Sequence, residues 1–261
     1  MKITLLLLLL WPFLATAQPK ERVRILFIGN SYTTYDGYNI PRKLNRMARA
    51  AGKRVLIRQH TTNGSTLRQH LDSRRARAKV DRRQWDYVVL QEQSWTAVAN
   101  AEDGMYPSVR SLDSLVKRRG GRTVLYLLMP KAYRPDAIFA LNGQDTVFYY
   151  RLFRDYGHAK DSLQQNHARI ARELGAMLAP VGPAFAQALA ERPGLSLYKK
   201  DRVHHSKAGA YLAACVFYAT LLREAPEGNR YQPNLSPGLT AFFQRVAART
   251  VLEDKPRWYL E

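Results

Sequence analysis

The sequence predicts an α/β domain with three layers, in which helices cover both faces of a parallel β-sheet. Short runs of apolar and β-branched residues alternate with longer segments of helical period. The short runs are almost continuously apolar, which is typical of strands that are buried on both faces of a parallel sheet. No internal repeat or Ser/Gly-rich linker divides the chain, so we expect a single domain over residues 22–252.

Each element follows from a local pattern. Five strands are expected, at Val23–Ile28, Val55–Thr61, Tyr87–Leu90, Thr123–Leu128 and Ala176–Val181. Helices are expected at residues 39–52, 108–121, 162–178 and 206–222, because apolar residues recur there at spacings of three and four. In the first of these helices Gly52 supplies the stop signal, and in the last Ser206 can cap the N-terminus.

Residues 1–17 have the layout of a secretory signal peptide: one lysine, an apolar run over residues 3–14, and an Ala-Thr-Ala end. The alternative is a membrane anchor, but a span needs about 20 apolar residues and this run is shorter. We therefore expect an exported protein, periplasmic or secreted, with no transmembrane anchor after cleavage. Cys215 is the one cysteine, so an internal disulfide is excluded, and its apolar surroundings indicate a buried thiol.

The chain is strongly basic, with a formal net charge of +20. Part of the excess lies in the run "RRARAKVDRR", residues 74–83. Such a charge raises the question of nucleic acid, but the export signal and the absence of interleaved aromatic residues argue against it. Anionic polymers of the cell envelope, lipid headgroups and a solvated face without a partner remain open.

Polar residues follow the first three predicted strands. Ser31 follows the first strand, Asn63 and Gly64 the second, and "QEQ" at residues 91–93 the third. Because binding sites in parallel sheets lie at the carboxyl ends of the strands, these clusters predict a site at that edge. Alone, Ser31 could equally be the cap of the next helix.

A second motif, "DRVHHSKAG", places Asp201 and His204 three residues apart. A serine hydroxyl is a weak nucleophile and needs a base within reach, and a carboxylate on the other ring nitrogen fixes the tautomer of that base. Ser31, His204 and Asp201 are therefore candidate catalytic residues. The backbone N–H groups of Ser31 and Gly64 and the amide of Gln93 are candidate oxyanion donors.

Further residues near these strand ends are candidates for substrate contacts: Tyr32, Tyr35, Asn63, Gln91 and Trp95. The aromatic rings could stack on a sugar or serve packing. Glu92 points to the opposite side of the strand from its neighbours and is expected to support the site. His204 and His205 lack the further ligands that a metal needs, so neither a metal nor a cofactor is expected. Residues 131–160 form an aromatic-rich insertion, either a lid or a packed segment.

In order, the blocks "FIGNSYT", "TTNGST", "VVLQEQS" and "DRVHHSKAG" resemble those of the SGNH (GDSL-type) hydrolase superfamily, over residues 24–222. The resemblance implies a flavodoxin-like sheet of order 2-1-3-4-5 and serine-dependent hydrolysis without a cofactor. Asn30 stands where the family usually has Asp, His205 replaces a common proline, and Gln93 replaces Asn. The change at position 93 leaves Gln91 as an alternative oxyanion donor. The change at position 205 makes His205 a second candidate for the base.

The expected activity is that of an exported serine esterase that removes a small acyl group, acetyl above all, from a carbohydrate. Three alternatives remain: a lipase-like or lysophospholipase-like esterase, a non-catalytic glycan-binding protein, and an acyltransferase. The expected partner is a small ester or an acylated glycan.

Overall fold

A parallel five-stranded sheet forms the centre of the molecule in the computed structural model, which describes residues 22–129 and 156–260. The strand order is β4-β1-β5-β6-β7, and each neighbouring pair is parallel. Numbered along the chain among themselves, these strands have the order 2-1-3-4-5, which confirms the predicted sheet. Their bounds are β1 Val23–Gly29, β4 Val55–Thr61, β5 Tyr87–Leu90, β6 Arg122–Leu127 and β7 Met177–Pro180.

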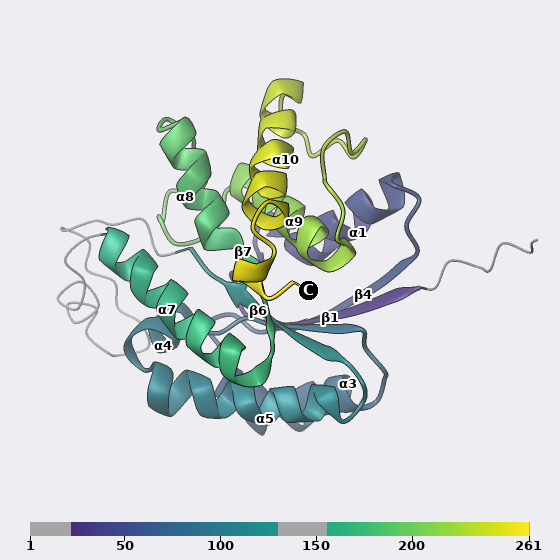
Figure 1. The fold of residues 1–261 in the computed structure, drawn as a ribbon, viewed down its shortest axis with the longest axis vertical. Coiled ribbons are helices and arrows are strands. Elements are labelled where there is room, and N and C mark those ends of the chain that lie inside the picture. The colour runs from purple at the N-terminus through teal and green to yellow at the C-terminus, as the bar shows by residue number, and fades with distance from the viewer. Residues whose placement is uncertain (1–21, 130–155, 261) are drawn as a thin grey trace, which may run out of the picture.

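Helices cover both faces of the sheet, as Figure 1 shows. One layer contains α1 Ile40–Ala50, α8 Val181–Glu191, α9 Lys207–Leu222 and α10 Pro237–Leu252. The other contains α2 Leu67–Asp72, α3 Arg74–Asp81, α4 Ser94–Ala99, α5 Tyr106–Lys117 and α7 Tyr156–Leu174. A π-helical turn, η1 Ala101–Met105, precedes α5, and a 3₁₀ turn, η2 Pro256–Trp258, lies near the end of the chain. The predicted three-layer arrangement is confirmed.

Sequence patterns found the long helices α1, α5, α7 and α9 and missed the others. The basic run 74–83, which the sequence left without an element, forms α3 because Ser73 caps it and Ala76 and Val80 are buried. A two-stranded hairpin, β2 Thr34–Tyr35 with β3 Tyr38–Asn39, was also missed. Its Asp36-Gly37 loop, with Gly37 at φ +83°, is the usual signal for a tight hairpin turn.

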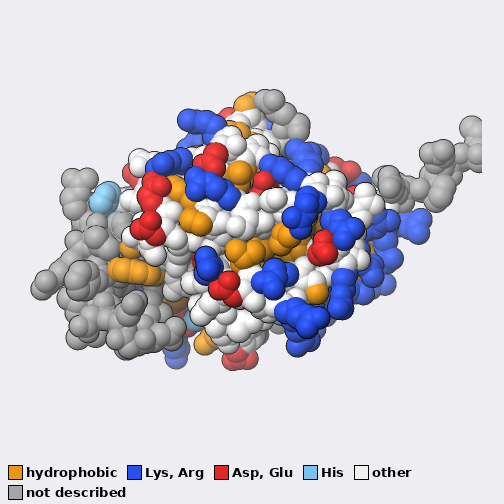
Figure 2. Space-filling model, turned by 90° about the horizontal axis from the view of Figure 1, so that it is seen from below, with side chains coloured by type: hydrophobic (Ala, Val, Ile, Leu, Met, Phe, Trp, Pro, Cys, Tyr) orange, Lys and Arg blue, Asp and Glu red, His pale blue; other side chains and the backbone are white. Residues whose placement is uncertain are grey.

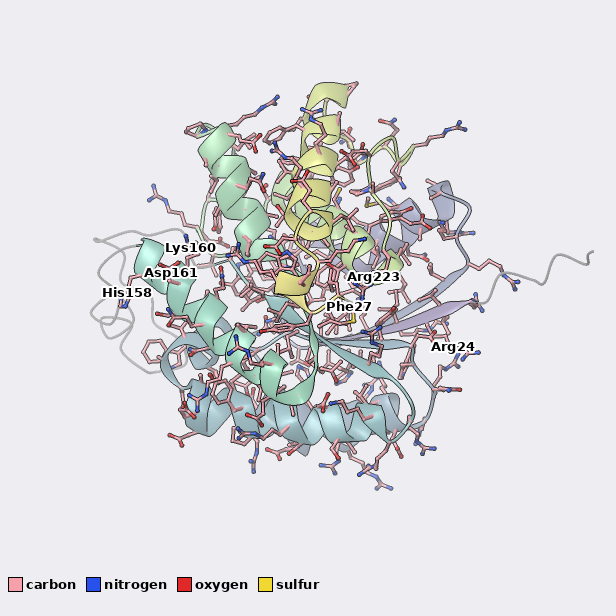
Figure 3. The ribbon with its side chains drawn as sticks, in the orientation of Figure 1. Arg24, Phe27, His158, Lys160, Asp161 and Arg223 are labelled. Carbon is pink, nitrogen blue, oxygen red and sulfur yellow. The ribbon has the colours of Figure 1, made fainter. Side chains whose placement is uncertain are left out.

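The helix predicted at residues 162–178 begins earlier and ends earlier. It starts at Tyr156 and stops at Leu174, where Gly175 adopts φ +58° and the chain then enters β7. Of the predicted insertion 131–160, residues 130–155 lie outside the described part of the chain. Figure 3 shows His158, Lys160 and Asp161 on the first turns of α7, and Arg24 on the opposite side of the molecule, where β1 begins.

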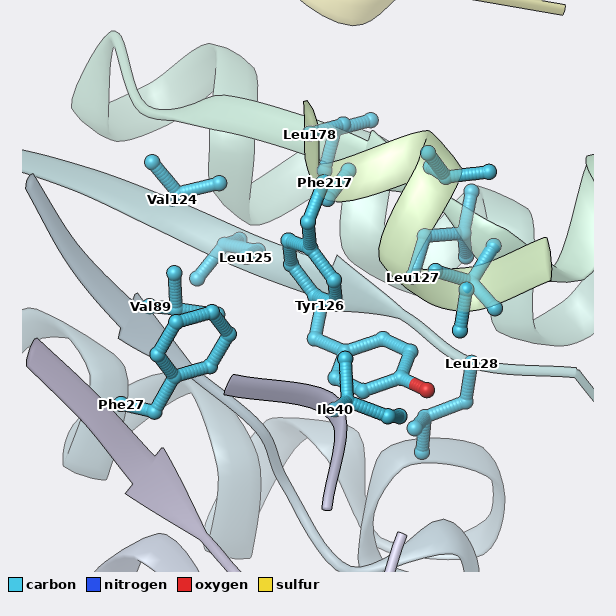
Figure 4. Packing of buried hydrophobic residues seen from close by; sticks show 14 of the residues in the cluster. Phe27, Ile40, Val89, Val124, Leu125, Tyr126, Leu127, Leu128, Leu178 and Phe217 are labelled. Carbon is cyan, nitrogen blue, oxygen red and sulfur yellow. The ribbon is translucent and has the colours of Figure 1, made fainter. Parts of the chain in front are cut away.

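The core covers both faces of the sheet, and on one of them it packs against α9, which is buried along almost its whole length. The ring of Phe217 on α9 makes edge-to-face contacts with Phe27 of β1 and Tyr126 of β6, with centroids 5.1 and 5.0 Å apart. Figure 4 shows these three rings among the aliphatic side chains of β5, β6 and β7. Cys215 lies in this helix as predicted, and burial raises the pKa of its thiol. Trp258 and Leu260, beyond residue 252, also belong to the core.

Residues 1–17, the predicted signal peptide, lie outside the described part of the chain. Among the described helices, none has the length and hydropathy needed to cross a membrane.

Candidate active site

Ser31 lies in a tight turn between β1 and the hairpin. The carbonyl of Asn30 accepts hydrogen bonds from the backbone N–H groups of Thr33 and Thr34, at 2.9 and 3.2 Å. The side-chain oxygen of Asn30 accepts from the N–H of Tyr32, at 3.1 Å, as Asn commonly does two residues ahead of its own position. The carbonyl of Ser31 itself accepts a hydrogen bond from the Tyr38 hydroxyl, at 2.5 Å. The turn therefore fixes Ser31 through its neighbours.

His204 and Asp201 extend from Ser31 in one hydrogen-bonded line. The Nε2 atom of His204 lies 2.9 Å from the Ser31 Oγ, and its Nδ1 atom lies 2.8 Å from the Asp201 Oδ2. A carboxylate only accepts, so Nδ1 carries the proton and Nε2 is left to accept from the serine hydroxyl. The structure thus brings together the three residues that the sequence selected.

Asp201 also organises its own loop, between α8 and α9. Its Oδ1 accepts from the backbone N–H groups of Val203 and His204, both at 2.9 Å, and Arg202, the residue after Asp201, adopts φ +57°. Partial burial alone would raise the pKa of Asp201, but these N–H donors and the His204 ring hold it below its ordinary value. The carboxylate stays ionised, which is the form that can orient an imidazole.

Three side chains tie the ends of β1, β4 and β5 to one another. The Asn30 amide donates to the Ser65 carbonyl at 2.8 Å, which joins β1 to the loop after β4. The Gln91 Oε1 accepts from the Asn30 N–H at 2.7 Å and from the Thr33 hydroxyl at 3.1 Å, which joins β5 to β1. The Glu92 Oε1 accepts from the Leu67 N–H at 3.1 Å, which joins β5 to the start of α2.

The three predicted oxyanion donors sit on these tied loops. Gly64 adopts φ +72° in a turn closed by the Ser65 N–H on the Thr62 carbonyl, at 3.2 Å. Gln93 caps α4, and its Oε1 accepts from the Thr96 N–H at 3.0 Å, so its Nε2 points away from the helix. Within the described part of the chain, the N–H groups of Ser31 and Gly64 and the Nε2 of Gln93 have no hydrogen-bond acceptor.

Two residues that were predicted to contact substrate, Gln91 and Tyr32, are buried. Gln91 is fully buried and its amide makes three hydrogen bonds within the scaffold, the third from Nε2 to the Glu92 carbonyl at 2.7 Å. One N–H of its Nε2 is used by that carbonyl, and full burial separates the amide from solvent. Tyr32 is 4% exposed and packs its ring 6.1 Å from those of His204 and His205, so it lines the site from beneath.

Tyr35 is near the site in a role other than the predicted sugar stacking. Its ring lies face to face with the His204 ring, with centroids 3.8 Å apart and planes 5° apart. The ammonium group of Lys199 lies over the Tyr35 ring, 4.8 Å from its centroid. Stacking on His204 and the contact with Lys199 thus occupy this half-buried ring, and its predicted contact with a sugar stays a prediction. The predictions for Asn63, which is exposed, and for Trp95, which packs partly against the core, remain predictions.

The two adjacent histidines have different surroundings. His205 is fully buried, its Nε2 lies 2.9 Å from the Tyr126 hydroxyl, and burial lowers its pKa to about 3. His204, by contrast, is the histidine that lies against Ser31.

Glu92 supports the loops, as expected, and burial raises its pKa to about 7 although the N–H groups of Gln93 and Leu67 donate to it. The contacts of Tyr38 and Lys199 were missed, because the hairpin that brings Tyr38 to the serine was not recognised.

The architecture defined by this sheet, with a polar site at the carboxyl edge of β1, β4 and β5, belongs to the flavodoxin-like α/β class. Solved structures share it. A protein from Slackia heliotrinireducens that is assigned to the SGNH hydrolases is 28% identical, with a TM-score of 0.60 over 77% of this chain and 99% of its own. Together with the four ordered motifs, this similarity places the chain in the SGNH hydrolase superfamily.

Two other structures share the fold at lower identity. A DUF4886 family protein from Bacteroides uniformis is 17% identical, with a TM-score of 0.73 over 89% of this chain and 95% of its own. An acetyl-xylooligosaccharide esterase from Geobacillus stearothermophilus is 18% identical, with a TM-score of 0.57 over 80% and 97%. The sequence matches no family model and no curated protein.

Proposed function

We propose that the protein is an exported serine esterase that hydrolyses small acyl esters, acetyl above all, on carbohydrates. The observation that supports it most directly is the hydrogen-bonded line from Ser31 through His204 to Asp201. A serine that merely capped a helix would have no need of a histidine whose far nitrogen is held by a carboxylate. This line also favours an enzyme over a non-catalytic binding protein.

In the proposed reaction the Ser31 Oγ attacks the ester carbonyl while the His204 Nε2 takes the hydroxyl proton. The imidazolium that forms is stabilised by Asp201, which accepts from Nδ1–H. The carbonyl oxygen becomes an oxyanion. When this tetrahedral intermediate collapses, the C–O bond to the alcohol breaks, and His204 returns the proton to the departing oxygen. Water then attacks the acyl-serine by the same route and releases the acid.

The N–H groups of Ser31 and Gly64 and the Gln93 Nε2 would receive the oxyanion. Donors that are fixed in advance stabilise this charge without reorganisation, and a single one contributes about 3 kcal/mol. Here the fixing comes from side chains that bind the backbone around the donors, as Asn30 does to Ser65 and Glu92 to Leu67. These contacts support a preorganised site.

Assays of the purified protein and two variants test the proposal. Hydrolysis of p-nitrophenyl acetate and release of acetate from acetylated xylan would be measured for the parent, Ser31→Ala and His204→Ala, with thermal unfolding as the folding control. We expect turnover by the parent and losses of several orders of magnitude in both variants. An inactive parent, or a Ser31→Ala protein as active as the parent, would overturn the proposal.

An acyl-chain series from acetyl to decanoyl separates the proposed substrate from the lipase-like alternative. We expect kcat/KM to be highest for acetyl and to fall with chain length. A maximum at long chains would replace the deacetylase by a lipase-like enzyme.

A further inference from the structure

Three surface hollows adjoin one another along α1: the first lies between α1, the hairpin and Tyr231, and the other two lie between α1 and the outer edge strand β4. The first, of about 390 Å³, is lined by Tyr35 and Tyr38 together with residues of α1. The second shares Asn39 and Arg42 with the first, and the third shares Asn45 with the second. They therefore form one continuous track, which runs from the hairpin back along α1. We call it the α1–β4 track.

The track begins at the proposed active site. Tyr35, which lines its first hollow, stacks on the His204 ring, and Tyr38, from the same hairpin, donates to the Ser31 carbonyl. A polymer lying in the track would thus have one of its units beside the reacting serine. This connection distinguishes the track from the rest of a basic surface.

Cations line the whole length of the track, and its lining residues in the described part of the chain include no Asp or Glu. Four of the cations belong to α1: Arg42, Lys43, Arg46 and Arg49. Three others, Lys53, Arg54 and Arg58, lie at or just before β4, and Arg22 directly precedes β1. Arg42, Arg46 and Arg49 have the spacing of one helical stripe, which extends about 10 Å along the axis.

Most of these cations lack an acidic partner. Within the described residues, Lys53 alone among them forms an ion pair, with Glu224. Some cations elsewhere on the surface do have acidic partners, as in the pairs of Arg110 with Glu173 and Arg119 with Asp81, whereas Arg74, Arg75 and Arg82 at α3 form no ion pair among the described residues. Figure 2, which views the molecule from the side of α3 and α5, shows that Lys and Arg side chains are also crowded toward the right of this other face, with Asp and Glu among them elsewhere.

Lys43 shows the electrostatic consequence. It is half-buried, and burial, followed by the charges of Arg46 and Lys207, lowers the pKa of its ammonium group. No carboxylate in the described residues opposes this effect. Like charges that are held together without counter-ions favour an anionic ligand.

We propose that the α1–β4 track binds an anionic polysaccharide and that this polymer is the acylated substrate. That the polymer is the substrate rests on the proposed function, whereas its binding to the track does not. Arginine side chains spaced along a groove match a chain whose sugars carry carboxylate or phosphate groups at intervals. The aromatic residues of the track are confined to its site end, so stacked bases along its length are not expected.

One competing explanation predicts no ligand at all. The outer edge of β4 has no neighbouring strand among the described residues, and charged side chains commonly protect such edges from pairing with other chains. Protection needs charge at the edge strand, near Arg54 and Arg58. It does not need a second row of cations on α1, and so α1 is the place to test.

The binding test uses two triple variants of equal charge change, both made in Ser31→Ala protein so that no turnover occurs. One replaces Arg42, Arg46 and Arg49 by Gln. The matched control replaces Arg74, Arg75 and Arg82, at α3 on the other layer, by Gln. Calorimetry would measure binding of polygalacturonate, phosphomannan and neutral dextran at 50 and 300 mM NaCl, with single-stranded DNA and phosphatidylglycerol vesicles as the other polyanions.

We expect one or both anionic polysaccharides to bind and dextran not to bind. The α1 triple variant should bind at least about tenfold more weakly, since exposed charge pairs contribute up to about 1 kcal/mol each, and the α3 triple variant should stay within about twofold. Comparing the affinities for polygalacturonate and phosphomannan then shows whether the track prefers carboxylate or phosphate groups.

Several results would overturn the assignment: no binding of either anionic polysaccharide at 50 mM NaCl, equal losses in the two triple variants, or tighter binding of DNA or vesicles than of both polysaccharides. Since the binding is measured without turnover, an inactive parent in the esterase assay would refute the proposed function and leave this result standing.

Discussion

Gln91 and Gln93 are two residues apart but have different roles: Gln91 holds the loops together, and Gln93 is the proposed oxyanion donor. Gln91→Met keeps the length of the side chain and removes its amide. The Asn30 N–H, the Thr33 hydroxyl and the Glu92 carbonyl then lose their partner in a fully buried place. A buried polar group left unpaired costs about 1–3 kcal/mol, so for these three groups we expect a loss of about 3–9 kcal/mol in the free energy of unfolding. That is a large part of the stability of an ordinary domain.

Gln93 should behave in the reverse way. In Gln93→Glu the carboxylate oxygen can still accept from the Thr96 N–H and cap α4, while both N–H donors are lost. We expect unfolding within about 1 kcal/mol of the parent, and kcat lower by about 10²–10³, the effect of removing one oxyanion donor. Gln93→Met also removes the cap and should cost about 1 kcal/mol more in stability.

Urea unfolding and p-nitrophenyl acetate hydrolysis, measured on all three variants, give the comparison. The reasoning is refuted if Gln93→Glu keeps kcat within twofold of the parent. It is refuted equally by a Gln91→Met protein that is as stable as the parent but has lost its activity, because Gln91 would then be the donor.

Three other substitutions test the surroundings of the site. Tyr35→Leu removes the ring stacked on His204 and should lower kcat about 2- to 30-fold with little change in KM. Tyr35→Phe keeps the ring and should keep the kcat of the parent. An equal fall in kcat in both variants would contradict a positioning role for the ring. Burial raises the pKa of Glu92 to about 7 from its ordinary 4.5, so its contribution to stability is present below pH 4.5 and is lost as the pH rises toward 7. In urea titrations, the parent should weaken relative to Glu92→Gln by about 3 kcal/mol across that window, and a constant difference would disprove the shift. Gly29→Ala places a Cβ 2.5 Å from the Gln91 Oε1 and should cost about 1–3 kcal/mol in unfolding, whereas the control Gly194→Ala, with open space around it, should stay within about 0.5 kcal/mol.

The fold was predictable because four of its five strands, β1, β5, β6 and β7, are almost continuously apolar and buried, while the edge strand β4 begins with three apolar residues. Runs such as Val55–Thr61 and Tyr87–Leu90 have bounds that the structure reproduces. Among the missed helices, α10 does have apolar residues at spacings of three and four, whereas the short α3 has only two buried residues. In α3, burial of two residues beneath a surface of arginine and lysine is enough, since Ser73 caps the helix and its neighbours pack over it. Tertiary packing, rather than local pattern, determines such helices.

In the site, the residues that were predictable are those whose chemistry requires one residue type. A nucleophile, a base and its carboxylate are restricted to a few side chains, and the strand ends bring them to one edge of the sheet. The tasks of Gln91 and Tyr35 were not predictable, because an amide can serve either a scaffold or a substrate and a ring can stack on either a sugar or a histidine. The partner decides between these tasks, and partners come from distant segments: Asn30 for Gln91 and His204 for Tyr35.

The tripeptide at residues 91–93 shows how the loops around Ser31 become rigid while their donors remain available. Successive side chains leave a strand in opposite directions, so Gln91 reaches the loop after β1 and Glu92 reaches the loop after β4. Gln93, the third, starts α4 and keeps its Nε2 uncommitted among the described residues. In this arrangement the side chains of Gln91 and Glu92 accept from the N–H groups of Asn30 and Leu67. The N–H groups of Ser31 and Gly64 have no acceptor among the described residues. Donors prepared in this way are what an oxyanion requires.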